Sequence, residues 1–369
     1  YFDYVYDFSN FAYSYFKDNF DIIYKTLNFI DDLCKSKNID MIVMWNHVML
    51  PDCIVKLYCD KINKDVKTIY FENGYFRPNT ITMDTKGVNY DSSVPRNKSF
   101  YFNIEKRDLN RKNNKKIKKI KLNKLNMFET YLYKFIFWFK SLLFNRYKFF
   151  RLKHTFGQEV KNKLFRKIYK LREEKFNVNK KYIFIPFQVH DDSQIIKYSP
   201  NIDSMEELVD KLYKTFCKLK SKGVYNNVKL VFKEHPMDIG RINYHSLYKK
   251  YKDISWMIFL KKYNTLSLIK NAEFILTINS TVGIEALQLY KPVLTLGNTF
   301  YNIEELVINN SNLEYLETDI TRMKTFTPNK KLTENFLYYL KNIYHVKANW
   351  NSYDIKNNIN VIKKIREVL

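Results

Sequence analysis

Two polar stretches far apart in the chain carry the side chains best suited to catalysis. Residues 71–78 (FENGYFRP) contain Glu72, and residues 187–195 (FQVHDDSQI) contain Asp191 and Asp192. Each stretch follows an apolar run rich in β-branched and aromatic residues, which is typical of a buried strand. In open parallel α/β sheets, ligands bind beyond the carboxyl ends of the strands. Glu72 and the aspartate pair are therefore candidates for acid–base or nucleophilic chemistry.

The two aspartates have two interpretations. An acidic residue after a strand either caps the helix that follows or acts as a nucleophile or acid–base group. Pro200 delays the next helix, and Ser204 with Glu207 already forms a capping box for it. Capping is therefore a poor explanation for Asp192, and we favour a chemical role. Which of Asp191 and Asp192 would be the nucleophile stays open.

A histidine and a hydroxyl-rich stretch indicate anion binding at the same sheet edge. His235 ends a predicted strand, and the following Pro236 biases it toward extended geometry, so its ring could donate to a phosphate or serve as an acid. Asn279, Ser280 and Thr281 join a strand to a helix, whose first turn favours phosphate. An ordinary loop histidine and an ordinary helix cap would give the same patterns. Neither a Walker A loop nor a GxGxxG motif occurs.

The elements that would position these residues alternate between helix and strand, which predicts parallel sheets. In the first part we expect helices at about 18–37 and 51–64 and strands at 41–44 and 67–71. In the second part we expect strands at 182–185, 228–232, 274–278 and 293–296, with helices near 204–220, 242–252, 265–270 and 282–289. Residues 79–95 are rich in turn-forming residues, and two closing helices are expected at about 333–346 and 352–369.

The fold class predicted from this order is α/β, with two Rossmann-like domains facing across a cleft. We expect an N-terminal, acceptor-side domain at 1–175, a nucleotide-sugar-binding domain at 176–330, and closing helices at 331–369 that pack back across both. The chain does not begin with Met, which leaves open that a first strand of the N-terminal domain is missing. A basic helical insertion is expected at about 106–150.

The positive charge of the chain is concentrated in that insertion. The formal net charge is +25, but it comes from 52 Lys against 11 Arg, a bias that an AT-rich coding sequence would also produce. Residues 106–124 hold 10 Lys or Arg, and an aromatic segment follows at 127–150. A basic stretch beside an amphipathic aromatic helix is typical of a membrane surface contact. A solvated insertion that packs on its own domain is an equal alternative.

The cysteines indicate no metal or disulfide framework. Cys34, Cys53, Cys59 and Cys217 show no CxxC or Cys/His ligand spacing, so we expect reduced thiols in a cytosolic protein. No set of acidic ligands stands at a convincing strand end either. We therefore expect no metal and no cofactor.

Several motifs, in order along residues 71–306, resemble the bacterial capsule polysaccharide biosynthesis/export family, whose characterised members are β-Kdo glycosyltransferases (Kdo is 3-deoxy-manno-octulosonic acid). The matching residues are Glu72-Asn73-Gly74, Arg77-Pro78, Thr82, Gly87-Val88-Asn89 and Ser92; Gln188-Val189, Asp192-Ser193-Gln194-Ile195 and Ser199-Pro200; His235-Pro236; and Asn279-Ser280-Thr281-Val282-Gly283, Lys291-Pro292-Val293, Leu296-Gly297 and Tyr301. Glu234 and the long basic insertion depart from the family pattern.

The resemblance implies a GT-B fold and a retaining double displacement, with Asp192 as nucleophile, Glu72 as general acid/base, and His235, Ser280 and Thr281 on the phosphate of the donor CMP-Kdo. The family's phosphate-binding set would also include Lys233 and Asn279. Its substrate-binding set would comprise Gln188, Asp191, Ser193, Gln194, Asn73, Gly74 and Arg77.

The residues of these motifs are similar to those of family members that add the first Kdo to a lysophosphatidylglycerol anchor. A Kdo-bearing lipid is the other acceptor implied. The expected location is then cytoplasmic, on the inner face of the cytoplasmic membrane, beside a capsule assembly or export complex. Alternatives are a transferase for another sugar nucleotide, a non-catalytic export factor, a structural membrane scaffold and, least favoured, a nucleic-acid-binding protein. We expect no nucleic-acid partner.

Overall fold

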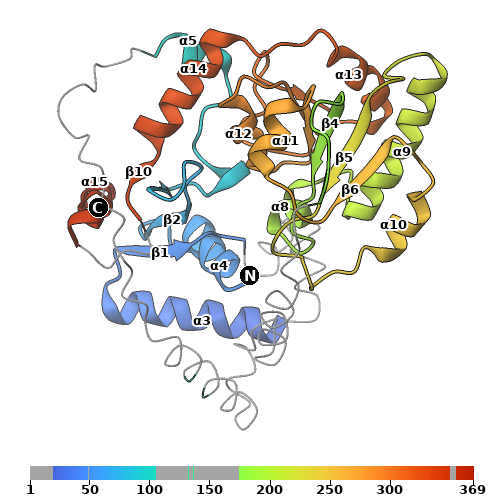
Figure 1. The fold of residues 1–369 in the computed structure, drawn as a ribbon. Coiled ribbons are helices and arrows are strands. Elements are labelled where there is room, and N and C mark those ends of the chain that lie inside the picture. Colours follow the sequence, from blue (N-terminus) through green and yellow to red (C-terminus); the bar gives the residue numbers. More distant parts are fainter. Residues whose placement is uncertain (1–19, 49, 105–131, 133–135, 137–173, 350–354) are drawn as a thin grey trace.

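The computed structural model describes residues 20–48, 50–104, 132, 136, 174–349 and 355–369. The predicted basic insertion lies outside this part of the chain, apart from two single positions. The described residues form two sheets that face each other, with the C-terminal segment returning to the first (Figure 1).

The C-terminal sheet has six parallel strands in the order β6-β5-β4-β7-β8-β9. Its strands are β4 (Tyr182–Pro186), β5 (Lys229–Lys233), β6 (Met257–Leu260), β7 (Ile275–Thr277), β8 (Val293–Thr295) and β9 (Ile308–Asn309). The sequence predicted four of these strands correctly and missed β6 and β9. Every residue of β4 is buried, as expected for a central parallel strand with helices on both faces.

Alternation along β4 divides the core of this sheet in two. Ile183 and Ile185 pack with one layer of helices, and Tyr182 and Phe184 pack with the other. The first layer contains α9 (Met205–Ser221), α10 (His245–Tyr251) and α13 (Leu316–Arg322), and the second contains α11 (Thr265–Asn271), α12 (Val282–Leu287) and α14 (Lys330–Tyr339). The smaller elements are α8 (Ser193–Tyr198) and η4 (Leu313–Tyr315).

The N-terminal sheet has the order β1-β2-β3-β10 and is only partly parallel. The predicted pair β1 (Met41–Trp45) and β2 (Lys67–Asn73) is parallel, whereas β3 (Thr80–Asp84) and β10 (Val346–Lys347) run antiparallel to their neighbours. Residues 79–95 therefore contain a strand as well as turns, because the β-branched run at 80–82 pairs back onto β2. The same region contains η2 (Asn89–Asp91), and α5 (Lys98–Phe102) follows it.

Helices cover both faces of the N-terminal sheet. One face packs on α3 (Phe20–Lys37), α4 (Leu50–Leu57) and η1 (Tyr58–Ile62), and the other on α15 (Ile355–Val368). The predicted α/β class with two facing Rossmann-like halves is confirmed, although the first half carries two antiparallel strands.

The C-terminal segment links the halves. Helix α14 packs in the core of the C-terminal sheet, and its Asn335 donates from Nδ2 to the carbonyl of Tyr101 (2.8 Å). After η5 (Leu340–Tyr344), strand β10 joins the N-terminal sheet. Tyr344 then donates to Asp84 Oδ2 (3.0 Å), and the backbone N–H of Tyr75 donates to His345 Nε2 (3.0 Å). The two sheets are thus held together by the C-terminal segment 330–347 as well as by their own loops.

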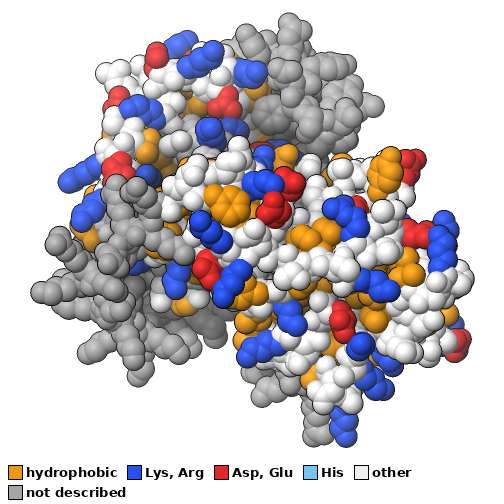
Figure 2. Space-filling model, turned by 90° about the horizontal axis from the view of Figure 1, so that it is seen from above, with side chains coloured by type: hydrophobic (Ala, Val, Ile, Leu, Met, Phe, Trp, Pro, Cys, Tyr) orange, Lys and Arg blue, Asp and Glu red, His pale blue; other side chains and the backbone are white. Residues whose placement is uncertain are grey.

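Lys and Arg side chains are scattered over the face seen in Figure 2, among apolar and acidic ones, and do not gather into one stripe there. In the part of the chain that the structure describes, no helix combines the length and the apolar character needed to cross a membrane.

Candidate active site

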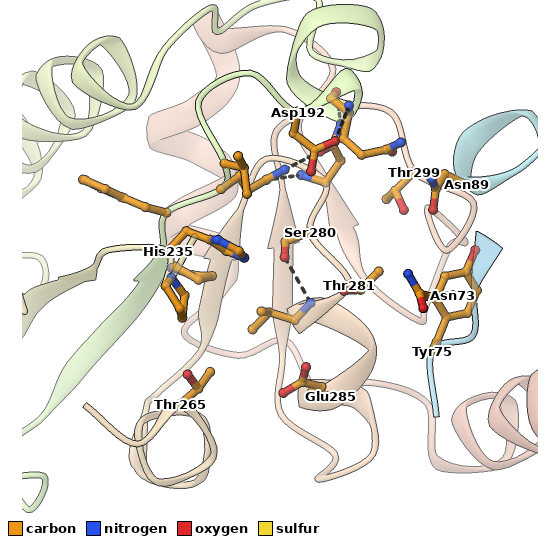
Figure 3. Close-up of a pocket in the computed structure, with 18 of the residues that line it drawn as sticks. Asn73, Tyr75, Asn89, Asp192, His235, Thr265, Ser280, Thr281, Glu285 and Thr299 are labelled. Atoms are coloured by element: carbon orange, nitrogen blue, oxygen red, sulfur yellow. Dashed lines mark hydrogen bonds between the residues drawn. The ribbon is translucent and has the colours of Figure 1, made fainter. Parts of the chain in front are cut away.

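A cavity of about 460 Å³ lies where the loops after β2, β4, β5 and β7 meet. Its volume lies within the range of about 300–1,000 Å³ usual for small-molecule sites. In Figure 3, Asp192, His235 and Ser280 surround this space, with Asn73 and Tyr75 opposite them. The sequence-predicted residues that line the cavity are Glu72, Asn73, Arg77, Gln188, Asp192, Gln194, Lys233, His235, Asn279, Ser280 and Thr281.

Asp192 has a structural contact in addition to its place in the cavity. Its Oδ1 accepts the backbone N–H of Gln194 (2.9 Å), which makes it the N-cap of the six-residue helix α8. The expectation that Asp192 is not a cap is therefore wrong, because a short helix fits between it and Pro200. Asp192 also lines the cavity, so its position is compatible with both capping and a chemical role.

Glu72 lies at the end of β2, on the opposite sheet from Asp192. Its Oε1 accepts from the backbone N–H (2.8 Å) and from Nδ2 (3.1 Å) of Asn73. Burial raises the pKa of Glu72 above its ordinary value, against these hydrogen bonds and the charge of Arg77, and the negative charge of Asp192 adds to the rise. A carboxyl group with a raised pKa near a second carboxylate is suited to act as a general acid or base.

Lys233 and His235 follow β5 at the other side of the cavity. Burial lowers the pKa of both. His235 Nδ1 accepts the backbone N–H of Met237 (3.1 Å), so a neutral imidazole carries its proton on Nε2. Lys233 is buried and donates from Nζ to the carbonyl of Glu234 (3.3 Å). A neutral N–H donor and a buried ammonium together suit an anion.

Gln188 and Asn279 bind each other. Gln188 donates from Nε2 to Asn279 Oδ1 (2.8 Å), and its Oε1 accepts the backbone N–H of Asn279 (3.1 Å). Asn279 Nδ2 donates to the carbonyls of Gln194 (2.8 Å) and Tyr198 (3.2 Å). These contacts use both Nδ2 protons of Asn279, so the pair fixes α8 against the ends of β4 and β7. These hydrogen bonds give both residues a positioning role. Both also line the cavity, so the substrate and phosphate contacts expected from sequence stay predictions.

Ser280 and Thr281 stand before α12, as predicted. Ser280 Oγ accepts the backbone N–H of Val282 (3.2 Å). Gly283 follows in the first turn, and a Cβ there would lie 2.5 Å from the hydroxyl oxygen of Tyr301, which itself donates to the carbonyl of Ser280. The absence of a side chain at Gly283 therefore leaves room for Tyr301. Through its hydrogen bond to Ser280, Tyr301 supports the loop that carries the Ser280 and Thr281 hydroxyls.

Three predicted site residues are placed differently. Asp191 is not among the lining residues; its Oδ2 pairs with Arg241 Nη2 at 2.7 Å. Gly74 does not line the cavity either, and a Cβ there would lie 2.2 Å from Thr80 Oγ1, so the glycine is required by the close approach of β3. Ser193 is the first residue of α8, and its side chain lies outside the described part of the structure.

The sequence reading missed several lining residues. Glu285 follows Thr281 by one helical turn, so that periodicity alone could have placed it on the same face. Burial raises the pKa of Glu285, against the charges of Arg77 and Lys233. The other polar residues missed are Tyr75, Asn89, Glu234, Thr265 and Thr299.

Next to the cavity, Asp91 joins the two halves of the molecule. Its Oδ2 accepts from His47 Nε2 (2.7 Å), Lys197 Nζ (2.8 Å) and the hydroxyl of Tyr198 (2.6 Å). Burial acts to raise the pKa of Asp91, but these hydrogen bonds and the lysine charge outweigh it and hold the pKa well below its usual range. Because Lys197 and Tyr198 belong to α8, this cluster anchors to the N-terminal half the same helix that Asp192 caps.

The Asp91→Asn variant is expected to lower the free energy of unfolding at pH 7 by about 1.5–3 kcal/mol, because charged hydrogen bonds are replaced by neutral ones. A depressed carboxyl pKa stabilises the fold above the unfolded-state pKa and stops doing so as the pH falls. The difference between wild type and variant should therefore persist from pH 7 to 5 and shrink below about pH 3.9. Urea unfolding at each pH measures it; a constant difference down to pH 2 would contradict the ionic origin.

Within the described residues, no group of three or more His, Cys, Asp or Glu side chains could hold a metal ion. All four cysteines are unpaired.

The geometry defines an α/β protein of the two-sheet class, with a polar, carboxylate-bearing cavity between its halves. Residues 48–351 match the family model "Capsule polysaccharide biosynthesis protein", and the chain belongs to this family.

The chain is also similar to individual proteins. The chain is 28% identical to the capsule polysaccharide export protein KpsS of Escherichia coli, over 75% of this chain and 71% of KpsS. It is 26% identical to the protein FixF of Sinorhizobium fredii, over 84% of this chain but 61% of FixF. A solved structure, the KpsC β-Kdo 2,7 transferase of Thermosulfurimonas dismutans, is 16% identical and aligns with 91% of this chain and 89% of that one, with a TM-score of 0.47.

Proposed function

We propose that this protein is a glycosyltransferase of capsule polysaccharide biosynthesis that transfers Kdo from CMP-Kdo to an anionic lipid, lysophosphatidylglycerol or a Kdo-bearing lipid. The observation that carries the proposal is the meeting of Glu72 and Asp192, from opposite sheets, in one cavity beside Lys233 and His235. Membership of the capsule family fits a role in making the polysaccharide.

In the proposed reaction, the donor phosphate lies by Lys233 and the Nε2–H of His235, near the hydroxyls of Ser280 and Thr281. The carboxylate of Asp192 attacks the anomeric carbon of Kdo as CMP leaves, which gives a glycosyl-enzyme. The acceptor hydroxyl then attacks the same carbon, the ester bond to Asp192 breaks and its carboxylate leaves, and Glu72 takes the proton of the hydroxyl. Two displacements retain the anomeric configuration, as in retaining glycosidases.

The charge of the cavity supports an anionic donor only if its carboxyl groups do not all ionise. Burial raises the pKa of Glu234 and Glu285, which favours their neutral forms. Lys233 and Arg77 supply positive charge in the same cavity. An anion entering the cavity would strengthen the preference of these glutamates for the neutral form.

The direct test is incubation of the protein with CMP-Kdo and a short-chain lysophosphatidylglycerol, with the product identified by mass spectrometry. We expect a product heavier than the acceptor by one Kdo residue, and CMP release that depends on the acceptor. Parallel reactions with other sugar nucleotides test the second candidate, a transferase with a different donor. Absence of transfer from every donor would favour a non-catalytic export factor, for which the name of KpsS is the supporting observation.

The proposal also includes a location in the cell. An acceptor in the inner leaflet would place the protein on the cytoplasmic face of the membrane, next to the capsule assembly and export machinery. The basic segment 106–124 would favour such a surface through its charge.

A further inference from the structure

A second hollow, of about 620 Å³, adjoins the active-site cavity. The two share Tyr75, Arg77, Thr281 and Glu285 in their linings. Lys341 and Lys347 line the second hollow and not the first. The shared residues make the two hollows neighbouring compartments of one cleft, and we call the second one the basic compartment.

The charges of the basic compartment are unbalanced. Arg77, Lys341 and Lys347 line it, and Glu285 is its one acidic lining residue among those the structure describes. In the described part of the chain, none of the three cations lies within 4 Å of a carboxylate oxygen, whereas Lys98, a cation elsewhere on the surface, pairs with two. A concave surface with unpaired cations attracts an anionic ligand.

Chain topology brings these cations together. Arg77 lies in the turn between β2 and β3, Lys341 in η5, and Lys347 in β10. Lys347 stands opposite Thr80 in the antiparallel β3–β10 pair, which brings the C-terminal segment beside the turn that holds Arg77. The returning segment therefore supplies two of the three cations.

Arg77 connects the basic compartment to the proposed chemistry. Its charge acts on Glu72, on Glu285 and on His235, and it lines both the first cavity and the basic compartment. A ligand whose anionic end sits by the lysines would pass Arg77 and Tyr75 on the way to Glu72.

We propose that the basic compartment binds the anionic group, phosphate or carboxylate, of the acceptor, and so directs the acceptor hydroxyl toward Glu72. The assignment rests on the proposed function, because it presumes sugar transfer in the first cavity. It separates the substrates: the donor phosphate binds at Lys233 and His235, and the acceptor anion binds at Lys341, Lys347 and Arg77.

The test is the double variant Lys341→Gln/Lys347→Gln, which removes two charges from the compartment. We expect the KM for lysophosphatidylglycerol to rise at least about tenfold, as for the loss of charged contacts to an anion, with the KM for CMP-Kdo changed less than about twofold. The matched control is Lys218→Gln/Lys249→Gln, which removes two exposed lysines that line neither hollow and should leave both constants unchanged.

Two acceptors distinguish the sources of the anion. One is lysophosphatidylglycerol, which presents a phosphate, and the other is a Kdo glycoside without phosphate, which presents a carboxylate. A larger effect of the double variant on one of them identifies the group that the compartment holds. An equal rise in KM for donor and acceptor, or no rise for either acceptor, would overturn the assignment.

A binding measurement keeps this inference separate from the proposed function. Calorimetric titration with monomeric short-chain lysophosphatidylglycerol, without donor, should show binding at least about tenfold weaker for the double variant than for the control variant. If no sugar is transferred but this difference in binding is present, anion binding in the basic compartment is supported and the transferase proposal is contradicted. If lipid binding is the same in both variants, the compartment is wrong whatever the activity.

Discussion

The Asp192→Asn variant is expected to lose sugar transfer at least about 1,000-fold, as enzymes do when a nucleophile is removed, while its thermal stability stays close to that of the wild type. Asparagine caps helices as well as aspartate does, so the hydrogen bond to the N–H of Gln194 survives the change. What is lost is the negative charge and the ability to form a glycosyl ester. Alanine is the poorer choice, because losing the cap would itself cost about 1 kcal/mol.

The neighbouring Asp191→Asn variant is the matched control. Asp191 pairs with Arg241 and does not line the cavity, so its loss should reduce transfer less than about tenfold, within the range of a weakened surface ion pair. Comparing the two variants decides which aspartate is the nucleophile, the alternative that the sequence left open.

Protein mass spectrometry gives a second readout. Wild-type protein incubated with CMP-Kdo alone should gain the mass of one Kdo residue on the peptide that contains Asp192, and the Asn variant should not. Full turnover by Asp192→Asn would leave this residue with its capping role alone and would contradict the double-displacement mechanism.

The sequence was sufficient to place the site at strand ends because parallel strands bring their carboxyl ends to one edge of a sheet. Glu72, Asp192, His235 and Ser280 each follow a buried apolar run, and all four line one cavity. Local pattern thus located the residues that line the cavity, and the two-sheet arrangement brought positions 72 and 192 to the same cavity.

Local sequence patterns could not predict the elements that depend on pairing between distant parts of the chain. Strand β10 is two residues long and exists because 346–347 pair with 80–81, a contact that no local periodicity signals. The convergence of Lys341 and Lys347 on Arg77 depends on that pairing, so the basic compartment was not predictable. Helix α8 was missed for a different reason: six residues are too few for a helical period to be recognised.

Side-chain amides show a third limit of prediction from sequence. Gln188 and Asn279 look like ligand-binding groups because they stand at strand ends, but they hydrogen-bond to each other. Sequence reveals which polar groups reach the sheet edge, and only coordinates reveal which of them are already paired. The positioning role of this pair follows from the hydrogen bonds alone.

The Glu72→Gln variant is expected to reduce kcat by about 10²–10⁴-fold, the usual contribution of a general base. Gln keeps the Oε1 that accepts from Asn73, so the loop geometry is preserved while the titrating group is removed. CMP is a good leaving group and needs little help from an acid, so the step with the acceptor should slow most. The variant should therefore accumulate the glycosyl-enzyme, which intact-protein mass spectrometry detects.

The pH dependence provides the sharper test of Glu72. Burial and the charge of Asp192 raise its pKa above the ordinary 4.5. A base must be deprotonated, so wild-type kcat should rise with pH through that raised pKa and then level off, and the Gln variant should lack this acid limb. Glu234→Gln is the matched comparison, because burial also raises the pKa of Glu234 but its carboxylate accepts a hydrogen bond from Tyr248; it should keep the limb. An acid limb that persists in Glu72→Gln and vanishes in Glu234→Gln would transfer the role of base to Glu234.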